Sequence, residues 1–189
     1  MKARTGLLLI LLGCLVWAPS ARAQDQLWAL LKKPGHFVLL RHSNAPGTVP
    51  ESNDMNFKDC TIQRNLDDEG RAQAVRLGNG FRKYGIRQVR LLSSQYCRAI
   101  ETGKLLKLGP VKEAPVLNQA VLSRPMEIQE AGVKGLAYLK ALPKQLTVLV
   151  SHVTNIQAIA GVLLDSGQMA VVHLDAAGKV VVDGKITVP

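Results

Sequence analysis

Short apolar runs alternate along the chain with longer segments in which apolar residues recur at helical spacing. Runs of this length are typical of buried strands, and the longer segments fit helices with one apolar face. Strands are predicted at 36–40, 89–92, 111–117, 147–150, 169–174 and 180–186, and helices at 24–33, 67–84, 98–106, 127–142 and 155–164. The alternation predicts an α/β fold: a three-layer α/β/α sandwich around a mostly parallel sheet, with the last two strands as an antiparallel edge.

The segment 1–23 has the pattern of a secretory signal peptide. A basic start is followed by an apolar run over 6–17 and by an Ala-x-Ala ending, which predicts cleavage after Ala23. The apolar run is too short for a stable membrane span. Lipoprotein attachment at Cys14 is the less favoured alternative, because the residues that follow it would then have no role. We expect a periplasmic or secreted protein with a single domain over 24–189.

The charge of the chain favours anionic partners. The formal net charge is +10, and loss of the signal peptide would leave +7 because that segment holds three basic residues and no acidic one. Nucleic acid is not expected, since the basic residues are scattered, only three Phe and three Tyr are present for stacking, and no nucleic-acid-binding motif occurs. A small phosphorylated substrate or a phosphorylated envelope glycan fits an exported basic protein better. The sequence does not specify an oligomeric state.

Cationic side chains follow three of the predicted strands. The strand over 36–40 runs directly into Arg41 and His42, and Arg98 and His152 follow two later strands. Ligands of open α/β sheets bind outside the carboxyl ends of the strands, so we expect these side chains to converge on one pocket. Arginine suits a phosphate group there, because its planar fork matches two oxygens at once.

The motifs around these residues resemble the histidine phosphatase superfamily, the fold of cofactor-dependent phosphoglycerate mutases and acid phosphatases. The matching pieces stand in the family's order: Leu40-Arg41-His42, Gln63–Ala74, Ser93-Ser94 with Arg98-Ala99 and Glu101-Thr102, and Ser151-His152. Ser43 stands where Gly is commonest in the family. The resemblance implies a phosphoglycerate mutase-like fold and a phosphatase that needs neither cofactor nor metal.

The resemblance also implies the role of each residue. His42 would attack phosphorus and form a phosphohistidine that water hydrolyses. Arg41, Arg98 and His152 would hold the phosphoryl oxygens, where the charge of the transition state is spread. The substrate would be a phosphomonoester such as a sugar or lipopolysaccharide-core phosphate. A non-catalytic module of the same fold that binds phosphate or a phosphosugar is the alternative.

Other polar residues near these motifs are secondary candidates. Asn44 and Arg64 are candidates for substrate contact, although an ordinary loop hydrogen bond is the favoured role for each. The residues after Leu117 offer no carboxyl group that would protonate a leaving oxygen. The candidates for that general acid are Glu113, Glu127, Glu130 and Asp59.

Two cysteines remain after signal cleavage, Cys60 and Cys97. An even pair in an exported chain predicts a disulfide, which would fasten the loop after His42 to the second strand end. Two buried free thiols are the alternative.

No metal site is expected. The sequence contains no His-x-His, no His-Glu-x-x-His and no clustered Cys/His spacing. His36 and His173 lie outside the motifs, and both are predicted to be structural or exposed.

Overall fold

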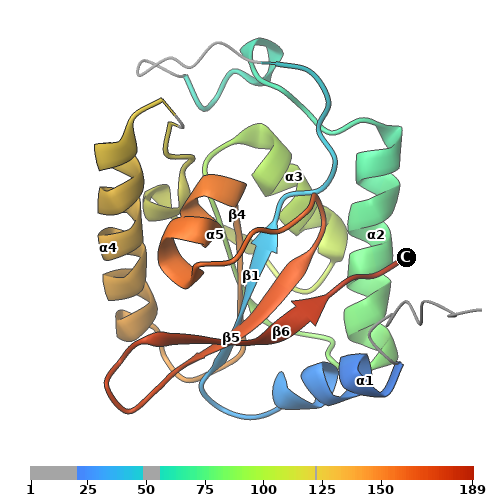
Figure 1. Ribbon diagram of the computed structural model, residues 1–189. Helices are drawn as coiled ribbons and strands as arrows, with labels where there is room; N and C mark the ends of the chain where they lie inside the picture. Colours follow the sequence, from blue (N-terminus) through green and yellow to red (C-terminus); the bar gives the residue numbers. More distant parts are fainter. Residues whose placement is uncertain (1–20, 49–55, 122) are drawn as a thin grey trace, which may run out of the picture.

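The computed structural model describes residues 21–48, 56–121 and 123–189, and its centre is one six-stranded sheet of order β3-β2-β4-β1-β5-β6 (Figure 1). The strands are β1 (His36–Arg41), β2 (Arg90–Ser93), β3 (Val111–Glu113), β4 (Thr147–Ser151), β5 (Met169–Leu174) and β6 (Val180–Ile186). The first four are parallel, β5 is antiparallel to β1, and β6 is antiparallel to β5. The prediction of a mostly parallel sheet that ends in an antiparallel pair is confirmed.

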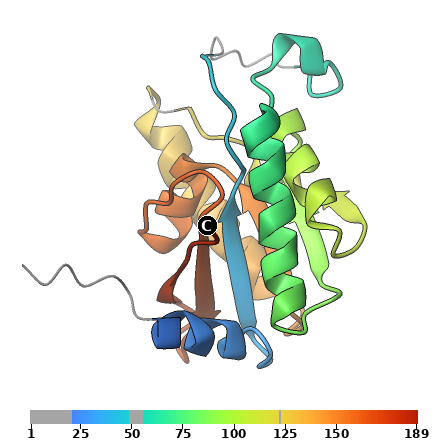
Figure 2. The same ribbon diagram turned by 90° about the vertical axis from the view of Figure 1, so that its right-hand side faces the viewer.

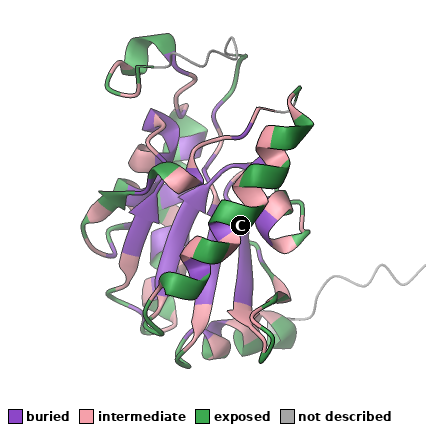
Figure 3. Ribbon diagram, turned by 90° about the vertical axis from the view of Figure 1, so that its left-hand side faces the viewer, coloured by how far each residue is buried: buried purple, intermediate pink, exposed green. Residues whose placement is uncertain are grey.

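Helices cover both faces of the sheet. One face carries α1 (Ala21–Leu30), α2 (Asp68–Lys83) and α3 (Cys97–Leu106), and the other carries α4 (Pro125–Ala141) and α5 (Val153–Ala160) (Figure 1). The central strands are buried between these layers, whereas the outer sides of the helices are exposed (Figure 3). The predicted three-layer α/β/α sandwich is therefore confirmed.

Strand β1 shows why the sequence pattern predicts this architecture. Its four apolar residues alternate between the two sides of the sheet. Val38 and Leu40 pack in the core under α1, α2 and α3, and Phe37 and Leu39 pack in the core under α4 and α5. A strand with cores on both faces has no polar face, so it reads as a continuous apolar run.

Three predicted elements differ from the structure by three residues or more at one end or both. The strand predicted over 111–117 ends at Glu113, because Pro115 lacks the N–H that a continuing ladder needs and begins a 3₁₀ turn instead. The helix predicted over 155–164 is α5, which starts at Val153 and stops at Ala160 because Gly161 adopts the left-handed conformation at φ +67°. The helix predicted over 24–33 ends at Leu30 and begins at Ala21.

The predicted signal peptide lies mostly outside the described residues, since only its last three residues fall in α1. Within the described part of the chain, every helix is too short or too polar to cross a membrane.

The direction of the parallel strands positions the candidate site. Strand β1 starts at the end of the molecule where α1 lies and runs toward the opposite end (Figure 2). Strands β2 and β4 run parallel to this direction, with Arg41 opposite Ser151 and Ser93 opposite Val150. The residues that follow the three strands therefore emerge at the same edge of the sheet.

Candidate active site

The four residues predicted to form the pocket lie together at the carboxyl edge of the sheet. Arg41 and His42 follow from β1, His152 is the N-cap residue of α5 after β4, and Arg98 lies in the first turn of α3 after β2. Arg98 donates hydrogen bonds to both histidines. The ring centroids of His42 and His152 are 5.2 Å apart.

His42 is a neutral imidazole with a fixed tautomer. Its side chain is buried, and Nδ1 lies 2.8 Å from the carbonyl oxygen of Ser43. A carbonyl only accepts hydrogen bonds, so the proton is on Nδ1 and the lone pair is on Nε2. Burial, and next the positive charge of Arg98, lower the pKa of His42 to about 3. The Nε2 lone pair is thus available at neutral pH, where it accepts a hydrogen bond from Nε of Arg98 at 3.2 Å.

Arg98 orients His152 as well. Its Nη2 lies 3.2 Å from Nδ1 of His152, and because a guanidinium only donates, Nδ1 is the acceptor. Nε2–H of His152 then donates to Oγ of Ser94 at 2.8 Å. Burial, followed by the charge of Arg98, holds the pKa of His152 well below its ordinary value. Both histidines are therefore neutral at neutral pH.

The guanidinium of Arg98 is itself held in place on two sides. Nη2 donates to Oε1 of Gln119 at 2.5 Å, and the group lies 4.4 Å from the ring centroid of Tyr96, a cation–π distance. Burial, and next the charge of Arg64, lower the pKa of Arg98 to about 10. At neutral pH Arg98 is therefore still charged, and it is buried and rigid, which suits recognition of an oxyanion.

Arg41 adds a second guanidinium. Its Nη1 donates to the carbonyl of Leu164 at 2.8 Å, and its Nε is buried without a hydrogen-bond partner among the described residues. Burial and the charge of Arg64 lower the pKa of Arg41, whereas Asp165 raises it. Buried donors without partners are uncommon, and an anion in the pocket would supply the missing acceptor.

Arg64 and Asn44 are the two secondary candidates for substrate contact. Arg64 affects the site through its charge, whereas Asn44 forms a hydrogen bond at the start of a helix. The charge of Arg64 lowers the pKa of Arg41, His42, Arg98 and His152, so it contributes to the positive field of the pocket. Its Nη1 donates to a loop carbonyl at 3.3 Å. The side chain of Asn44 instead donates to a carboxyl oxygen at the N-terminus of α2, at 2.9 Å. Asn44 therefore fastens the loop after β1 to that helix.

The carboxyl groups predicted as candidate acids have other partners. Asp59 caps the 3₁₀ turn Cys60–Ile62, and Glu113 accepts a hydrogen bond from a glutamine amide. Glu127 and Glu130 form ion pairs with nearby basic side chains, at 2.9 and 2.6 Å. In the described residues, none of these four carboxyls contacts His42 or Arg98. Of the described carboxyl groups, only Asp165 acts on one of the four pocket residues, through its charge near Arg41.

Cys60 and Cys97 form a disulfide, as the sequence predicts. The bond joins the 3₁₀ turn Cys60–Ile62 to the first residue of α3, directly before Arg98. Oε1 of Gln63 accepts a hydrogen bond from the backbone N–H of Cys97 at 3.0 Å, so a second contact ties the same loop to the helix. A cavity of about 880 Å³ lies beside the disulfide and is lined by both cysteines.

Sequence reasoning missed Gln119 as a site residue. The segment after Leu117 offers no carboxyl group, and the amide of Gln119 carries no pattern in the sequence that links it to Arg98. Only the packing of the loop before α4 against the start of α5 brings it there: Asn155 donates to the carbonyl of Asn118 at 2.7 Å and accepts from the N–H of Ala120 at 2.9 Å.

Solved structures share this fold over most of the chain. The putative phosphohistidine phosphatase SixA from Agrobacterium tumefaciens matches with a TM-score of 0.56 at 17% identity, over 82% of this chain and 99% of that one. Phosphoglycerate mutase from Thermus thermophilus matches at 0.56 and 18%, over 82% and 99%. A phosphoserine phosphatase mutant from Entamoeba histolytica, in complex with phosphoserine, matches at 0.60 and 12%, over 79% and 95%.

No family model matches the sequence, and no curated protein does. At these low identities the structural matches establish the fold, and they confirm the phosphoglycerate mutase-like architecture that the motifs predict.

Proposed function

We propose that this chain, which has the fold of the histidine phosphatase superfamily, is an exported, metal-independent phosphatase that hydrolyses a phosphomonoester through a phosphohistidine on His42. The observation that carries the proposal is the contact between Nδ1 of His42 and the Ser43 carbonyl. It leaves the lone pair of a neutral imidazole on Nε2, beside a charged guanidinium. A nucleophile and a group that binds its target are thereby adjacent.

The reaction has two steps. In the first, Nε2 of His42 forms a bond to phosphorus while the bond between phosphorus and the ester oxygen breaks, and the leaving oxygen takes a proton from water. In the second, water attacks phosphorus and gives a proton to the hydroxide left by the first step, the bond to Nε2 breaks with its electron pair returning to nitrogen, and inorganic phosphate leaves. Arg41, Arg98 and His152 hold the phosphoryl oxygens in both steps, where they stabilise the charge of each transition state.

The positions of the candidate acids limit which leaving groups the enzyme can expel. None of the candidate acids contacts the nucleophile in the described residues, so we infer that the enzyme favours leaving groups that need little protonation. A chain with an N-terminal signal pattern and a cysteine pair meets its substrate outside the cytoplasm. A small phosphorylated substrate or a phosphorylated envelope glycan, such as a sugar or lipopolysaccharide-core phosphate, fits that compartment.

A binding module that retains phosphate without turnover is the second candidate. The observation that favours it is the same lack of a carboxyl group in contact with His42 in the described residues. The pairing of a neutral His42 with Arg98 favours catalysis instead, because binding alone does not require an unprotonated imidazole nitrogen beside the guanidinium.

The test is hydrolysis of p-nitrophenyl phosphate in EDTA by the chain from Gln24 onward. This substrate has a good leaving group, so turnover does not depend on a general acid. His42→Ala is the test variant, and His173→Gln, a histidine outside the pocket, is the matched control. Labelled phosphate is trapped by acid and by base quenching in parallel, because a phosphohistidine is labile to acid and stable to base.

We expect turnover in EDTA for the unsubstituted chain and for His173→Gln, with a label that survives base and not acid. His42→Ala should lose both the turnover and the label. Phosphate binding by a chain that shows no turnover with this substrate would support the binding module. A label that survives acid would assign the nucleophile to another residue type.

A further inference from the structure

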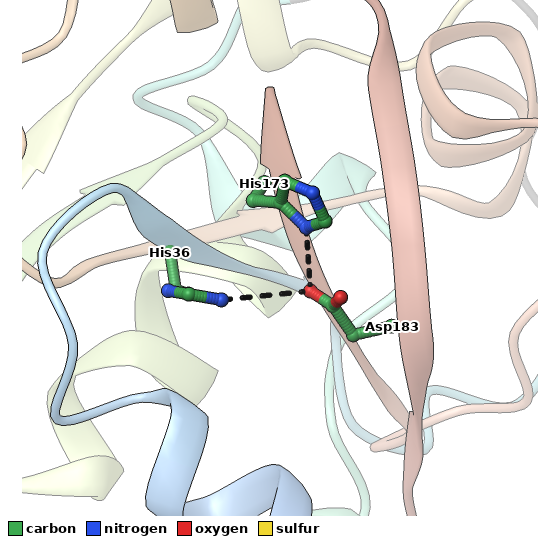
Figure 4. Close-up of side chains that lie close together, drawn as sticks. All are labelled: His36, His173 and Asp183. Carbon is green, nitrogen blue, oxygen red and sulfur yellow. Dashed lines mark hydrogen bonds and ion pairs between the residues drawn. The ribbon is translucent and has the colours of Figure 1, made fainter. Parts of the chain in front are cut away.

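Three side chains of the types that commonly ligate metals meet at the end of the sheet opposite His42. His36 is the first residue of β1, His173 lies near the end of β5, and Asp183 lies in β6 (Figure 4). One ligand atom from each residue lies within 4.8 Å of the other two. It is the one such His/Cys/Asp/Glu group found in the described part of the chain. All three residues are partly buried, and His173 keeps 34% of its side chain exposed, so solvent reaches the cluster.

Strand register builds this cluster. His36 and His173 are opposite each other across β1 and β5, with their ring centroids 5.6 Å apart. Asp183 is the additional residue of a β-bulge in β6, because Val172 pairs with Val182 while Val171 pairs with Gly184. A bulge re-aims a side chain, and here the Asp183 carboxylate points at both imidazoles (Figure 4).

Within the cluster, one hydrogen bond joins His173 to Asp183, and His36 has no share in it. Nδ1 of His173 lies 3.0 Å from Oδ2 of Asp183, a normal hydrogen bond. Nε2 of His36 lies 3.9 Å from the same oxygen, which is too long for one. Nδ1 of His36 is buried and has no partner among the described residues. Among the residues that the structure describes, His36 is thus an imidazole in a polar cluster with no hydrogen bond of its own.

The separations between the ligand atoms fit a shared ion. Ligand atoms bound to a tetrahedral zinc ion at about 2.0–2.1 Å lie about 3.3 Å from one another. The observed separations of 3.0 and 3.9 Å from Oδ2 of Asp183 lie on either side of this value. The three ligand atoms all lie within 4.8 Å of one another, so small side-chain rotations would bring them to one metal.

We propose that His36, His173 and Asp183 bind a divalent transition-metal ion of the zinc type, with water in the remaining position. Nε2 of His36, Nδ1 of His173 and Oδ2 of Asp183 are the ligand atoms. Two imidazoles and one carboxylate suit zinc better than calcium or magnesium, which prefer oxygen ligands alone. The ion joins β1, β5 and β6 at the end of the sheet away from His42, so it stabilises the fold and takes no part in phosphate chemistry.

The first experiment is calorimetric titration of zinc chloride into the EDTA-stripped, untagged chain. We expect one ion per chain, and a dissociation constant at least about 10–100-fold weaker for Asp183→Asn and for His173→Gln. The exposed carboxyl variant Glu130→Gln is the matched control and should bind as the unsubstituted chain does. The chain has four histidines, two of them in the phosphate pocket, so His42→Ala should also keep its one zinc ion. Loss of binding in His42→Ala, with binding intact in Asp183→Asn, would overturn the proposal.

The second experiment is thermal unfolding with and without zinc. The ion should raise the midpoint of the unsubstituted chain and leave that of Asp183→Asn unchanged. If Asp183→Asn does not fold, His173→Gln replaces it, since His173 is the most exposed of the three. Hydrolysis of p-nitrophenyl phosphate by either folded variant should equal that of the unsubstituted chain, so failure of the metal site and failure of the phosphatase proposal give different results. An equal midpoint shift in variant and unsubstituted chain would place the metal elsewhere.

Discussion

Folding disfavours the charged form of His42, so the stability of the folded chain depends on pH. Its pKa is about 3 in the folded chain and near the ordinary 6.5 when unfolded. Between these values the unfolded chain binds a proton that the folded chain does not, so stability falls as the pH drops from 6.5 toward 3. One such imidazole contributes a slope of about 1.4 kcal/mol per pH unit.

We therefore predict that His42→Ala reduces the pH dependence of stability. Denaturant unfolding at a series of pH values between about 6 and 5 gives the slope for each protein. The slope of the variant should be shallower by about one proton, whatever the cost of the cavity at its optimum pH. Equal slopes for the two chains would mean that His42 titrates normally in the folded protein.

Gln119 positions the guanidinium of Arg98. Its effect on activity can be separated from its effect on the stability of the loop. Its amide oxygen accepts a hydrogen bond from the Arg98 guanidinium, and bonds to charged groups contribute about 1.5–3 kcal/mol. We predict that Gln119→Ala lowers kcat/KM for p-nitrophenyl phosphate about 10–100-fold and weakens inhibition by inorganic phosphate. Steady-state kinetics with phosphate as the competing ligand measures both.

The control for Gln119→Ala is the substitution Asn118→Ala at the neighbouring residue. Asn118 exchanges hydrogen bonds with Gln95 and does not contact Arg98 in the described structure. Asn118→Ala should lower the unfolding midpoint with a smaller effect on kcat/KM. Equal kinetic losses in the two variants would mean that the loop as a whole, and not the contact with Arg98, determines activity.

At the scale of elements, the disulfide between Cys60 and Cys97 joins a long loop to the helix that carries Arg98. The two cysteines are 37 residues apart, and closure of a loop of this length is worth about 3–4 kcal/mol in the unfolded-state entropy model. We predict that Cys60→Ser/Cys97→Ser lowers the free energy of unfolding by about this amount. Urea unfolding measures it, and dithiothreitol should destabilise the unsubstituted chain without affecting the double variant. An unfolding midpoint that is insensitive to dithiothreitol would contradict the prediction.

The sequence predicts elements well where one local property determines them. Strand β1 is such a case, because its residues face two cores and read as one apolar run. Helix α2 is another, since Asp67 caps it by accepting the N–H of Gly70 at 2.7 Å, and an acidic first turn precedes the apolar positions. The prediction is wrong after Glu113, where an apolar run continues through Pro115 although the ladder does not.

The sequence predicts that Arg41 and His42 reach the carboxyl edge of the sheet because one local property, strand direction, determines it. It gives no sign of the cluster of His36, His173 and Asp183, because that cluster depends on long-range pairing. Arg41 and His42 follow a strand in sequence, so strand polarity alone places them at the carboxyl edge. His173 and Asp183 come together with His36 only through an antiparallel register and a bulge. Sheet order and bulges depend on long-range packing, and the spacing of residues in sequence does not record them.

At the scale of the whole molecule, the core formed by the described residues begins after the predicted cleavage site. The buried residue nearest the N-terminus in the described structure is Trp28, which packs on Phe81 and Tyr84. Cleavage after Ala23 would remove three residues of α1 and leave this contact intact. A chain that begins at Gln24 would therefore keep the residues that attach α1 to the sheet.

We predict that the chain from Met1 onward, produced in a bacterium with a periplasm, is recovered there with Gln24 as its first residue and no free thiols. Intact mass and N-terminal sequencing identify the cleavage site, and thiol titration of the denatured protein reports the cysteines. Ala23→Leu should block cleavage, because a signal peptidase needs a small residue at that position, whereas Ala18→Leu is the matched control. Cys14→Ser should change nothing. A fatty acyl chain on the protein that disappears in Cys14→Ser would instead establish a lipoprotein, and the molecule would then act at a membrane surface.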